Sequence, residues 1–206
     1  IMDPMAVTFA TADHAMLLDT RSLEFELVPI PRAAAIAVID SGVRHEIAGE
    51  GYRGRRAECS RAAELLGVAA LRDLSAADLP RIDLLERPLD RRARHVVTEN
   101  ARVLETVAAF RDERVDDAGK AFLDSHRSLS QDFEVSTPEI DALVDLARSE
   151  PDVHGARITG GGFGGAVVLL ASRAAAARAA RSVAGKYAAL TRKRPTVLVP
   201  EGADPP

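Results

Sequence analysis

Five glycines occupy six consecutive positions, Gly160 to Gly165, with only Phe163 among them. Glycine loses more conformational freedom on folding than any other residue, so we expect such a cluster where the backbone needs positive φ or a ligand comes close. Backbone N–H groups in a loop of this kind can form a concave site for an anion such as phosphate. The structural alternative is a flexible turn, or a place where two backbone segments pack closely.

The glycine cluster lies between two apolar runs that favour β-strands, residues 153–158 and 166–170. This arrangement predicts the tip of a hairpin. The cluster is not a P-loop, because no Gly-Lys-Ser/Thr follows it, and its context does not match the dinucleotide-binding fingerprint between a strand and a helix.

The other residues with reactive side chains indicate no second site. Cys59 is the only cysteine, which excludes an intramolecular disulfide and a cysteine-based zinc cluster, and we expect it to be a small buried residue of a helix. The basic clusters 91–95 and 192–194 are short and contain no aromatic residue, so we interpret them as solvated faces. No metal is assigned to the histidines, because none has a metal-ligand spacing. They are His14, His45, His95, His126 and His154.

The composition is that of a globular protein. The chain has 206 residues, of which 47% are hydrophobic and 28% charged, enough for one large domain or a domain with a fragment of another. Its net charge of −4 gives no reason to expect binding to nucleic acid or to an anionic membrane. No run approaches the roughly 18 apolar residues of a membrane span, and the first residues lack signal-peptide features. We expect a cytoplasmic protein.

Hydrophobic periodicity separates strands from helices along the chain. Strands are predicted at 14–19, 25–28, 35–40, 153–158, 166–170 and 196–199. Helices are predicted at 52–66, after Ser75, around 96–110, at 115–130, from Pro138 to about 149, and at 173–190. Gly67 ends the first of these helices, and Thr137 caps the one that begins at Pro138. The core stripe of the 96–110 helix is predicted to be Val96, Val103, Leu104, Val107 and Phe110.

The order of these elements predicts an α+β fold. From residue 35 onward the chain gives strand, helices, hairpin, helix and strand, which is a βαββαβ order with extra helices inserted after the first strand. This order is typical of a ferredoxin-like sheet with helices on one face.

Five stretches, in order along the chain, resemble the C-terminal half of galactokinases, which are members of the GHMP family of small-molecule kinases. The string Arg-Arg-Ala-Arg-His-Val-Val-Thr-Glu-Asn narrows the resemblance from GHMP kinases in general to galactokinase-like chains. The stretches are residues 1–3, 40–56, 91–100, 125–129 and 155–165.

The resemblance implies a domain organisation. Residues 1–31 would be a remnant of the N-terminal GHMP kinase domain, containing its last strands, and residues 32–206 would form the C-terminal domain. The family's sugar-binding signature and its Gly/Ser-rich phosphate loop have no counterpart here. The resemblance therefore implies that this chain is a fragment of a longer protein. The missing N-terminal segment of that protein would be its partner, and the fragment alone would have no kinase activity.

The resemblance also implies the reaction and its residues. The reaction would be ATP-dependent phosphorylation of the anomeric hydroxyl of galactose or a related sugar, with Asp3 as the catalytic base beside that hydroxyl. Substrate-binding positions would be Tyr52, Gly160 and Gly161. The positions nearest the nucleotide phosphates would be Gly162, Phe163, Gly164 and Gly165. The ligands of Mg²⁺ would belong to the N-terminal segment, and none is assigned here.

Two departures from the family pattern leave alternatives open. Pro4 follows Asp3 where galactokinases have Gln, and proline disfavours the helical conformation of the residue before it. Gly-Glu-Gly before Tyr52 is richer in glycine than in many relatives. The alternatives are a galactokinase-like protein that binds sugar and nucleotide without turnover, and a GHMP kinase for another sugar.

Overall fold

A computed structural model describes residues 2–11, 13–43 and 48–199 of the chain. The strands are β1 (His14–Leu18), β2 (Phe25–Pro29), β3 (Ala34–Asp40), β4 (Val153–Thr159), β5 (Ala166–Ser172) and β6 (Thr196–Leu198). The helices are α1 (Met2–Phe9), α2 (Ala48–Leu66), α3 (Leu79–Ile82), α4 (Leu89–Arg111), α5 (Val115–Gln131), α6 (Pro138–Arg148) and α7 (Ala176–Thr191). Helix α1 was not predicted, and α4 begins seven residues earlier than predicted, but the other elements agree closely with those predicted from periodicity and capping residues. Thr137 caps α6 as predicted, since its side chain accepts a hydrogen bond from the Ile140 N–H.

The larger sheet has the strand order β4-β5-β3-β6, and all of its neighbouring strands are antiparallel. In chain order, β3, β4, β5 and β6 are the first, second, third and fourth strands of this sheet. In the sheet they lie in the order second, third, first, fourth. That is the ferredoxin-like arrangement, so the predicted α+β fold is confirmed. The predicted hairpin is formed by β4 and β5, with Thr159 opposite Ala166 at its tip.

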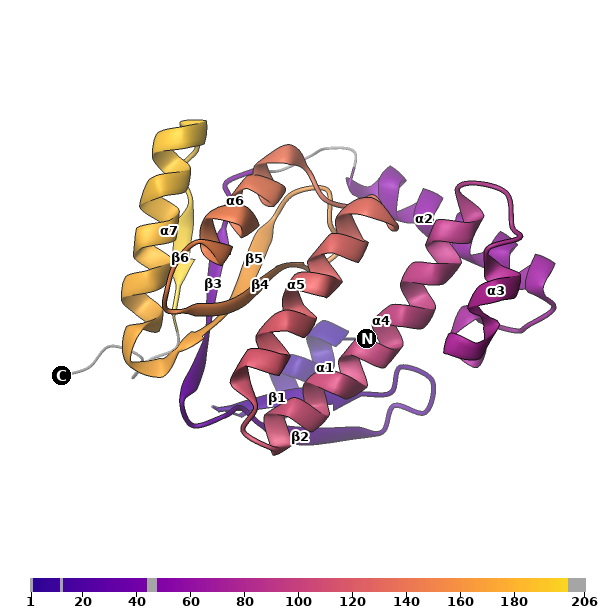
Figure 1. Cartoon of the computed structure of the whole chain (residues 1–206), viewed down its shortest axis with the longest axis horizontal. Coiled ribbons are helices and arrows are strands. Elements are labelled where there is room, and N and C mark those ends of the chain that lie inside the picture. Colours follow the sequence, from indigo (N-terminus) through magenta and orange to yellow (C-terminus); the bar gives the residue numbers. More distant parts are fainter. Residues whose placement is uncertain (1, 12, 44–47, 200–206) are drawn as a thin grey trace.

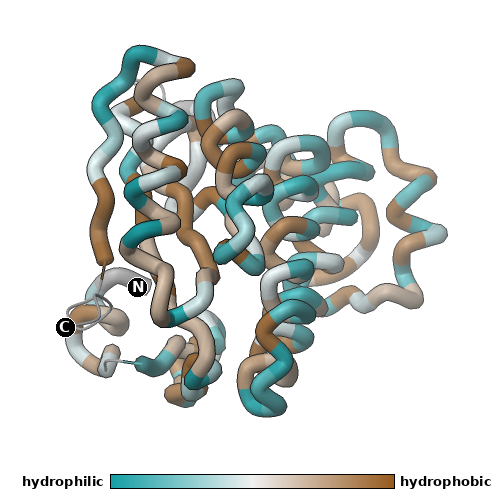
Figure 2. The backbone as a smooth tube through the Cα atoms, turned by 60° about the vertical axis from the view of Figure 1, so that its left-hand side comes forward, coloured by the Kyte–Doolittle hydropathy of each residue, from teal (hydrophilic) through white to brown (hydrophobic). Residues whose placement is uncertain are grey.

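Helices α6 and α7 cover one face of this sheet (Figure 1). Alternate residues of β3, β4 and β5 meet them in the main core, where Ile39, Ile158 and Leu169 are almost completely buried. Along the helices, hydrophilic and hydrophobic bands alternate (Figure 2), as expected for helices with one buried face. No helix in the described part of the chain is long and apolar enough to cross a membrane.

Helix α5 packs against β4 at very short range because each element has a glycine at the crossing. A Cβ built on Gly119 would lie 2.2 Å from the carbonyl oxygen of His154, and one built on Gly155 would lie 2.2 Å from that of Gly119. Any side chain larger than hydrogen would therefore push the two backbones apart. This crossing fixes the distance between the helical part of the molecule and the hairpin.

A separate two-stranded sheet, β1 and β2, precedes the larger one. It shares a core with α4 and α5, in which Val28 packs with Phe110, Ala118 and Leu170. In Figure 1 this small sheet lies beside α4 and α5, and α1 lies close to it. The division between residues 31 and 32 falls between the two sheets and stays a prediction.

Two expectations for α4 were wrong. Leu104 is 62% exposed and Val103 is 41% exposed, so the core stripe of this helix does not include them. The residues that α4 buries include Ala93, Val97 and Phe110.

The basic cluster 91–95 is not a solvated face, because Arg92 is 2% exposed and His95 is 5% exposed. Sequence patterning missed this because a buried arginine needs partners that lie elsewhere in the chain.

The buried guanidinium of Arg92 has partners from two other segments. Its Nε lies 2.7 Å from Glu58 Oε2 on α2, and its Nη2 lies 2.6 Å from Glu134 Oε2. Its Nη1 also donates to the carbonyl oxygen of Asp132. Arg92 thus joins α4, α2 and the connection between α5 and α6, and its burial follows from these contacts.

The α5–β4 crossing gives a first prediction. Gly119→Ala should lower the free energy of unfolding by about 1–3 kcal/mol, because the added methyl group overpacks the contact with His154. Chemical denaturation with a circular dichroism readout measures this. Gly185→Ala is the matched control, since Gly185 also lies inside a helix but has nothing within 4 Å of its Cβ position. The control should be neutral or stabilising by up to about 1 kcal/mol. Equal effects of the two variants would contradict the close-contact interpretation.

Arg92→Met gives a second prediction. It should lower the free energy of unfolding at neutral pH by about 2–3 kcal/mol. This loss is smaller than that for a fully buried ion pair, because Glu58 and Glu134 are partly exposed. The hydrogen bond from Arg92 is the largest cause that lowers the pKa of Glu134 below its ordinary 4.5. A carboxyl group whose pKa is lower in the folded state than in the unfolded state stabilises the fold at pH values above its unfolded-state pKa. This stabilisation is lost as the pH falls through the folded-state pKa.

The difference between wild type and Arg92→Met should therefore shrink as denaturation is repeated at pH values below about 4.5. Arg61→Met is the control, because Arg61 pairs with Glu64 on the exposed side of α2. It should change stability by less than about 1 kcal/mol. An Arg92→Met effect that is small, or that does not vary with pH, would refute the buried ion pair.

Candidate functional site

The glycine loop, residues 160–165, is anchored at two points to other parts of the chain. The Phe163 N–H donates to the carbonyl oxygen of Val135 at 2.6 Å, and the Gly165 N–H donates to that of Val43 at 3.0 Å. The carbonyl oxygen of Gly165 accepts from both the N–H and the hydroxyl of Ser41, at 2.9 and 2.6 Å. The loop is therefore held between the end of β3 and the connection from α5 to α6.

The glycines of the loop serve two different purposes. Gly162 and Gly164 have positive φ, and a Cβ on either would collide with the chain, at 2.6 Å from Val135 and 2.7 Å from the Val43 carbonyl oxygen. By contrast, a Cβ on Gly160 would meet nothing within 4 Å. The close-packing interpretation is therefore confirmed at Gly162 and Gly164, and the ligand-binding interpretation stays a prediction for the open positions. The inner glycines allow close backbone contact, and the outer ones leave open space.

Tyr52 lies beside the open part of the loop. A Cβ on Gly161 would be 4.0 Å from Tyr52 Cδ2, and Tyr52 is 57% exposed. The preceding residue, Gly51, faces the ring of Phe163 so closely that its Cβ would lie 2.6 Å from Phe163 Cζ. The start of α2 and the glycine loop are therefore in contact. Of the predicted site residues, the structure brings together Tyr52 and the loop.

Arg55, one turn after Tyr52, fixes α2 to the same connection that holds the loop. Its Nε donates to the carbonyl oxygen of Phe133 at 2.6 Å, and its Nη2 donates to that of Glu134 at 3.2 Å. Val135, which anchors Phe163, follows directly in the chain. Tyr52 and the loop are thus positioned by a shared support, residues 132–135.

Asp3 lies in the first turn of α1, and its side chain lies outside the described residues. The expectation that Pro4 would keep Asp3 from the helical conformation was wrong, because α1 runs from Met2 through Pro4 to Phe9. Proline is tolerated in the first turn, where its missing N–H would have no helical acceptor. The carbonyl oxygen of Pro4 accepts a hydrogen bond from the Thr8 hydroxyl at 2.8 Å.

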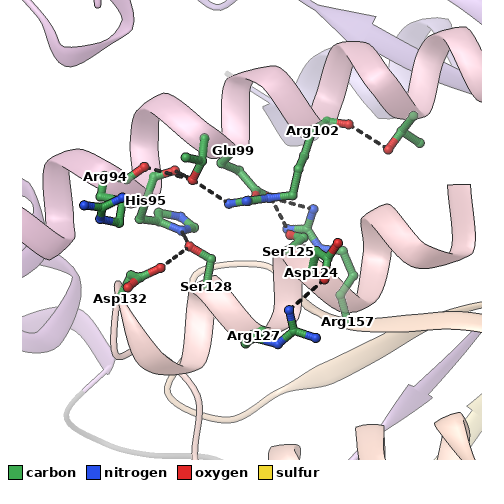
Figure 3. A network of polar contacts seen from close by, with 12 residues as sticks. Arg94, His95, Glu99, Arg102, Asp124, Ser125, Arg127, Ser128, Asp132 and Arg157 are labelled. Carbon is green, nitrogen blue, oxygen red and sulfur yellow. Dashed lines mark hydrogen bonds and ion pairs between the residues drawn. The ribbon is translucent and has the colours of Figure 1, made fainter. Parts of the chain in front are cut away.

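A buried polar network between α4, α5 and β4 was not predicted from the sequence (Figure 3). Glu99 Oε1 accepts from the Ser125 hydroxyl at 2.5 Å and from Arg157 Nη1 at 3.0 Å, and its Oε2 accepts from Arg102 Nε at 2.8 Å. These contacts with arginines and a hydroxyl hold the pKa of Glu99 below its usual value, although burial opposes the shift. The available signal was the spacing of Glu99 and Arg102 on one face of a helix.

His95 belongs to the same network. Its Nδ1 lies 3.0 Å from the Ser128 hydroxyl, which in turn bonds Asp132 Oδ2 at 2.7 Å, and its ring stacks on Phe133. Burial lowers the pKa of His95 to about 4, so the ring is neutral at pH 7. A neutral ring suits a packing role against the 132–135 connection.

The open end of the glycine loop presents groups that could contact a polar ligand. Tyr52 offers a phenol, and Gly160 and Gly161 allow a ligand to approach the backbone without meeting a Cβ. Within the described ranges, no cluster of three or more His, Cys, Asp or Glu side chains could hold a metal ion.

Comparisons with known proteins agree on one family. Residues 106–189 match the family model described as GHMP kinases C terminal. The galactokinase of Roseiflexus sp. (strain RS-1) is 39% identical over 99% of this chain and 54% of its own length. The Homo sapiens galactokinase is 42% identical over 91% of this chain and 48% of its own length. The chain spans about half the length of these relatives.

Solved structures give the same result. The structure of Lactococcus lactis galactokinase complexed with galactose matches with a TM-score of 0.88 and 28% identity, over 96% of this chain and 53% of that one. L. major mevalonate kinase, at a TM-score of 0.56 and 17% identity, shares the fold. The resemblance inferred from sequence motifs is confirmed: the chain contains a GHMP kinase C-terminal domain and is similar, in sequence and in structure, to the C-terminal portion of galactokinases.

Proposed function

We propose that this chain is the C-terminal part of an ATP-dependent sugar kinase that phosphorylates the anomeric hydroxyl of galactose or a close relative. The observation that carries the proposal is the contact of Tyr52 with the open end of the glycine loop, in a chain that matches a galactose-bound galactokinase over 96% of its length. The two features that the family resemblance assigns to the sugar are thus adjacent.

Tyr52 would contribute a hydrogen bond from its phenol and contact with the apolar face of the sugar ring. Gly160 and Gly161 would let a sugar or phosphate oxygen approach the backbone, where amide groups can stabilise negative charge. Gly162, Phe163, Gly164 and Gly165 would act mainly by holding this shape, because their contacts with Val135 and Val43 fix the loop. Positioning of this kind is a large part of catalysis in phosphoryl transfer.

Asp3 would accept the proton of the attacking hydroxyl, which is the role that the family resemblance assigns to it. When bound, ATP would supply the phosphoryl group and Mg²⁺ would neutralise charge on it. Their remaining ligands would come from the part of the relatives that this chain does not span. Helix α1 continues through Pro4, which supports a regular backbone at Asp3.

The division of labour in the loop gives a third prediction. In the kinase that contains this chain, Gly161→Ala should leave the melting temperature unchanged, because its Cβ would meet only Tyr52 at 4.0 Å. The added methyl group should nevertheless raise KM for galactose, since it narrows the ligand's approach. Gly162→Ala should instead lower the melting temperature, because it collides with Val135 at positive φ. Thermal melts and coupled ADP-release assays test this, and a destabilised Gly161→Ala with normal KM would contradict it.

Tyr52→Phe provides a fourth prediction. It should raise KM for galactose by roughly 3–10-fold, the equivalent of one lost hydrogen bond, and leave the fold intact. Phe keeps the ring contact, so Tyr52→Ala should cost more affinity than Tyr52→Phe. Arg61→Lys, on the exposed side of α2, is the control and should leave KM unchanged. If the wild-type kinase that contains this chain consumed no ATP with any of a panel of sugars, the kinase proposal would be refuted.

A further inference from the structure

A cavity of about 150 Å³ lies between the β1–β2 hairpin and helices α4 and α5, with β4 at its inner end. It contains neither Tyr52 nor any residue of the glycine loop, so it is distinct from the candidate sugar site. These elements lie side by side in Figure 1. Nothing in the proposed kinase reaction uses this cavity.

The walls of the cavity are mainly apolar. Leu17 comes from β1, Val28 from β2, Val107 and Phe110 from α4, and Phe122 from α5. A cavity of this volume with apolar walls is large enough for about one benzene ring. The cavity therefore favours a compact apolar group, not a sugar.

One end of the cavity is charged, and its charges do not balance. Among the described residues, the ionisable groups that line it are Glu99, Arg102 and Arg157, which together give two guanidinium groups to one carboxylate. Arg157 uses Nε and Nη1 in hydrogen bonds, and Arg102 uses Nε and Nη2. One terminal nitrogen of each arginine thus has no hydrogen-bond partner among the described residues. Figure 3 shows Arg102 beside Glu99 on α4, and Arg157, which comes from β4, approaching the same carboxylate.

A partly buried excess positive charge favours an anion with the geometry to accept hydrogen bonds from guanidinium groups. A carboxylate meets this requirement, because arginine and carboxylate form parallel, charge-assisted hydrogen bonds. We propose that the cavity binds a small monocarboxylate whose apolar part is about one phenyl ring in size. The apolar group would lie among Leu17, Val28 and Phe110, and the carboxylate would lie at Arg102 and Arg157.

Phenylacetate is the probe, compared with 2-phenylethanol and 2-phenylethylamine, which have a similar ring but a neutral or positive head. The protein is labelled with ¹³C at methionine methyl groups. Met16 lines the cavity, whereas Met5 lies in α1 and is not among the lining residues. Phenylacetate should shift the Met16 signal and leave the Met5 signal unchanged. It should bind at least about tenfold more tightly than the alcohol, and the amine should bind least.

Two variants separate a charge-matched site from a hydrophobic hollow. Arg102→Met leaves one guanidinium per carboxylate, so phenylacetate should lose its advantage over 2-phenylethanol. Arg127→Met is the matched control, because Arg127 pairs with Asp124 on α5 and does not line the cavity. Ala121→Leu should fill the cavity and abolish the Met16 shift for all three probes, with folding checked by circular dichroism.

Several results would overturn the proposal. They are an unchanged Met16 signal in the wild type, equal binding of acid and alcohol, a preference for the acid that survives Arg102→Met, and a Met16 shift that survives Ala121→Leu in folded protein. Each of these is measured by binding alone. They are therefore independent of whether the protein phosphorylates a sugar.

Discussion

One buried guanidinium, that of Arg92, connects the parts of the chain that the candidate site requires. It bonds Glu58 on α2, Glu134 in the connection between α5 and α6, and the backbone carbonyl of Asp132. An arginine is well suited to this task, because its planar group offers five donors in fixed directions. The two carboxylates remain partly exposed, so the arginine is neutralised without a second charge being fully buried.

The connection held by Arg92 supports both sides of the site. Arg55 on α2 bonds the carbonyl oxygens of Phe133 and Glu134, and Val135 accepts the hydrogen bond of Phe163. Tyr52 and the glycine loop are therefore positioned next to each other by one short segment, residues 132–135. The relation between them is set on one side by the Arg55 guanidinium, which bonds two backbone carbonyls, and on the other by a backbone hydrogen bond of Phe163.

Close backbone contacts complete the frame. Gly119 and Gly155 bring α5 against β4, and β4 leads directly into the glycine loop. Arg157 of the same strand anchors the Glu99 network, which closes the polar end of the cavity under β1 and β2. The glycine loop and the cavity are thus built on one strand, and no residue of the loop lines the cavity.

The sequence by itself determined most of the secondary structure and the ferredoxin-like order of strands. The hairpin, the Thr137 cap and the helix starting at Pro138 depend on neighbouring residues, so local patterns were enough to predict them. Motif resemblance also indicated the family and the importance of Tyr52 and the loop. The tertiary structure alone decided that Arg92 is buried, that Leu104 is exposed, and which loop glycines pack and which stay open. These outcomes depend on contacts between residues far apart in the chain, and no local periodicity encodes which partner a side chain or a glycine will meet.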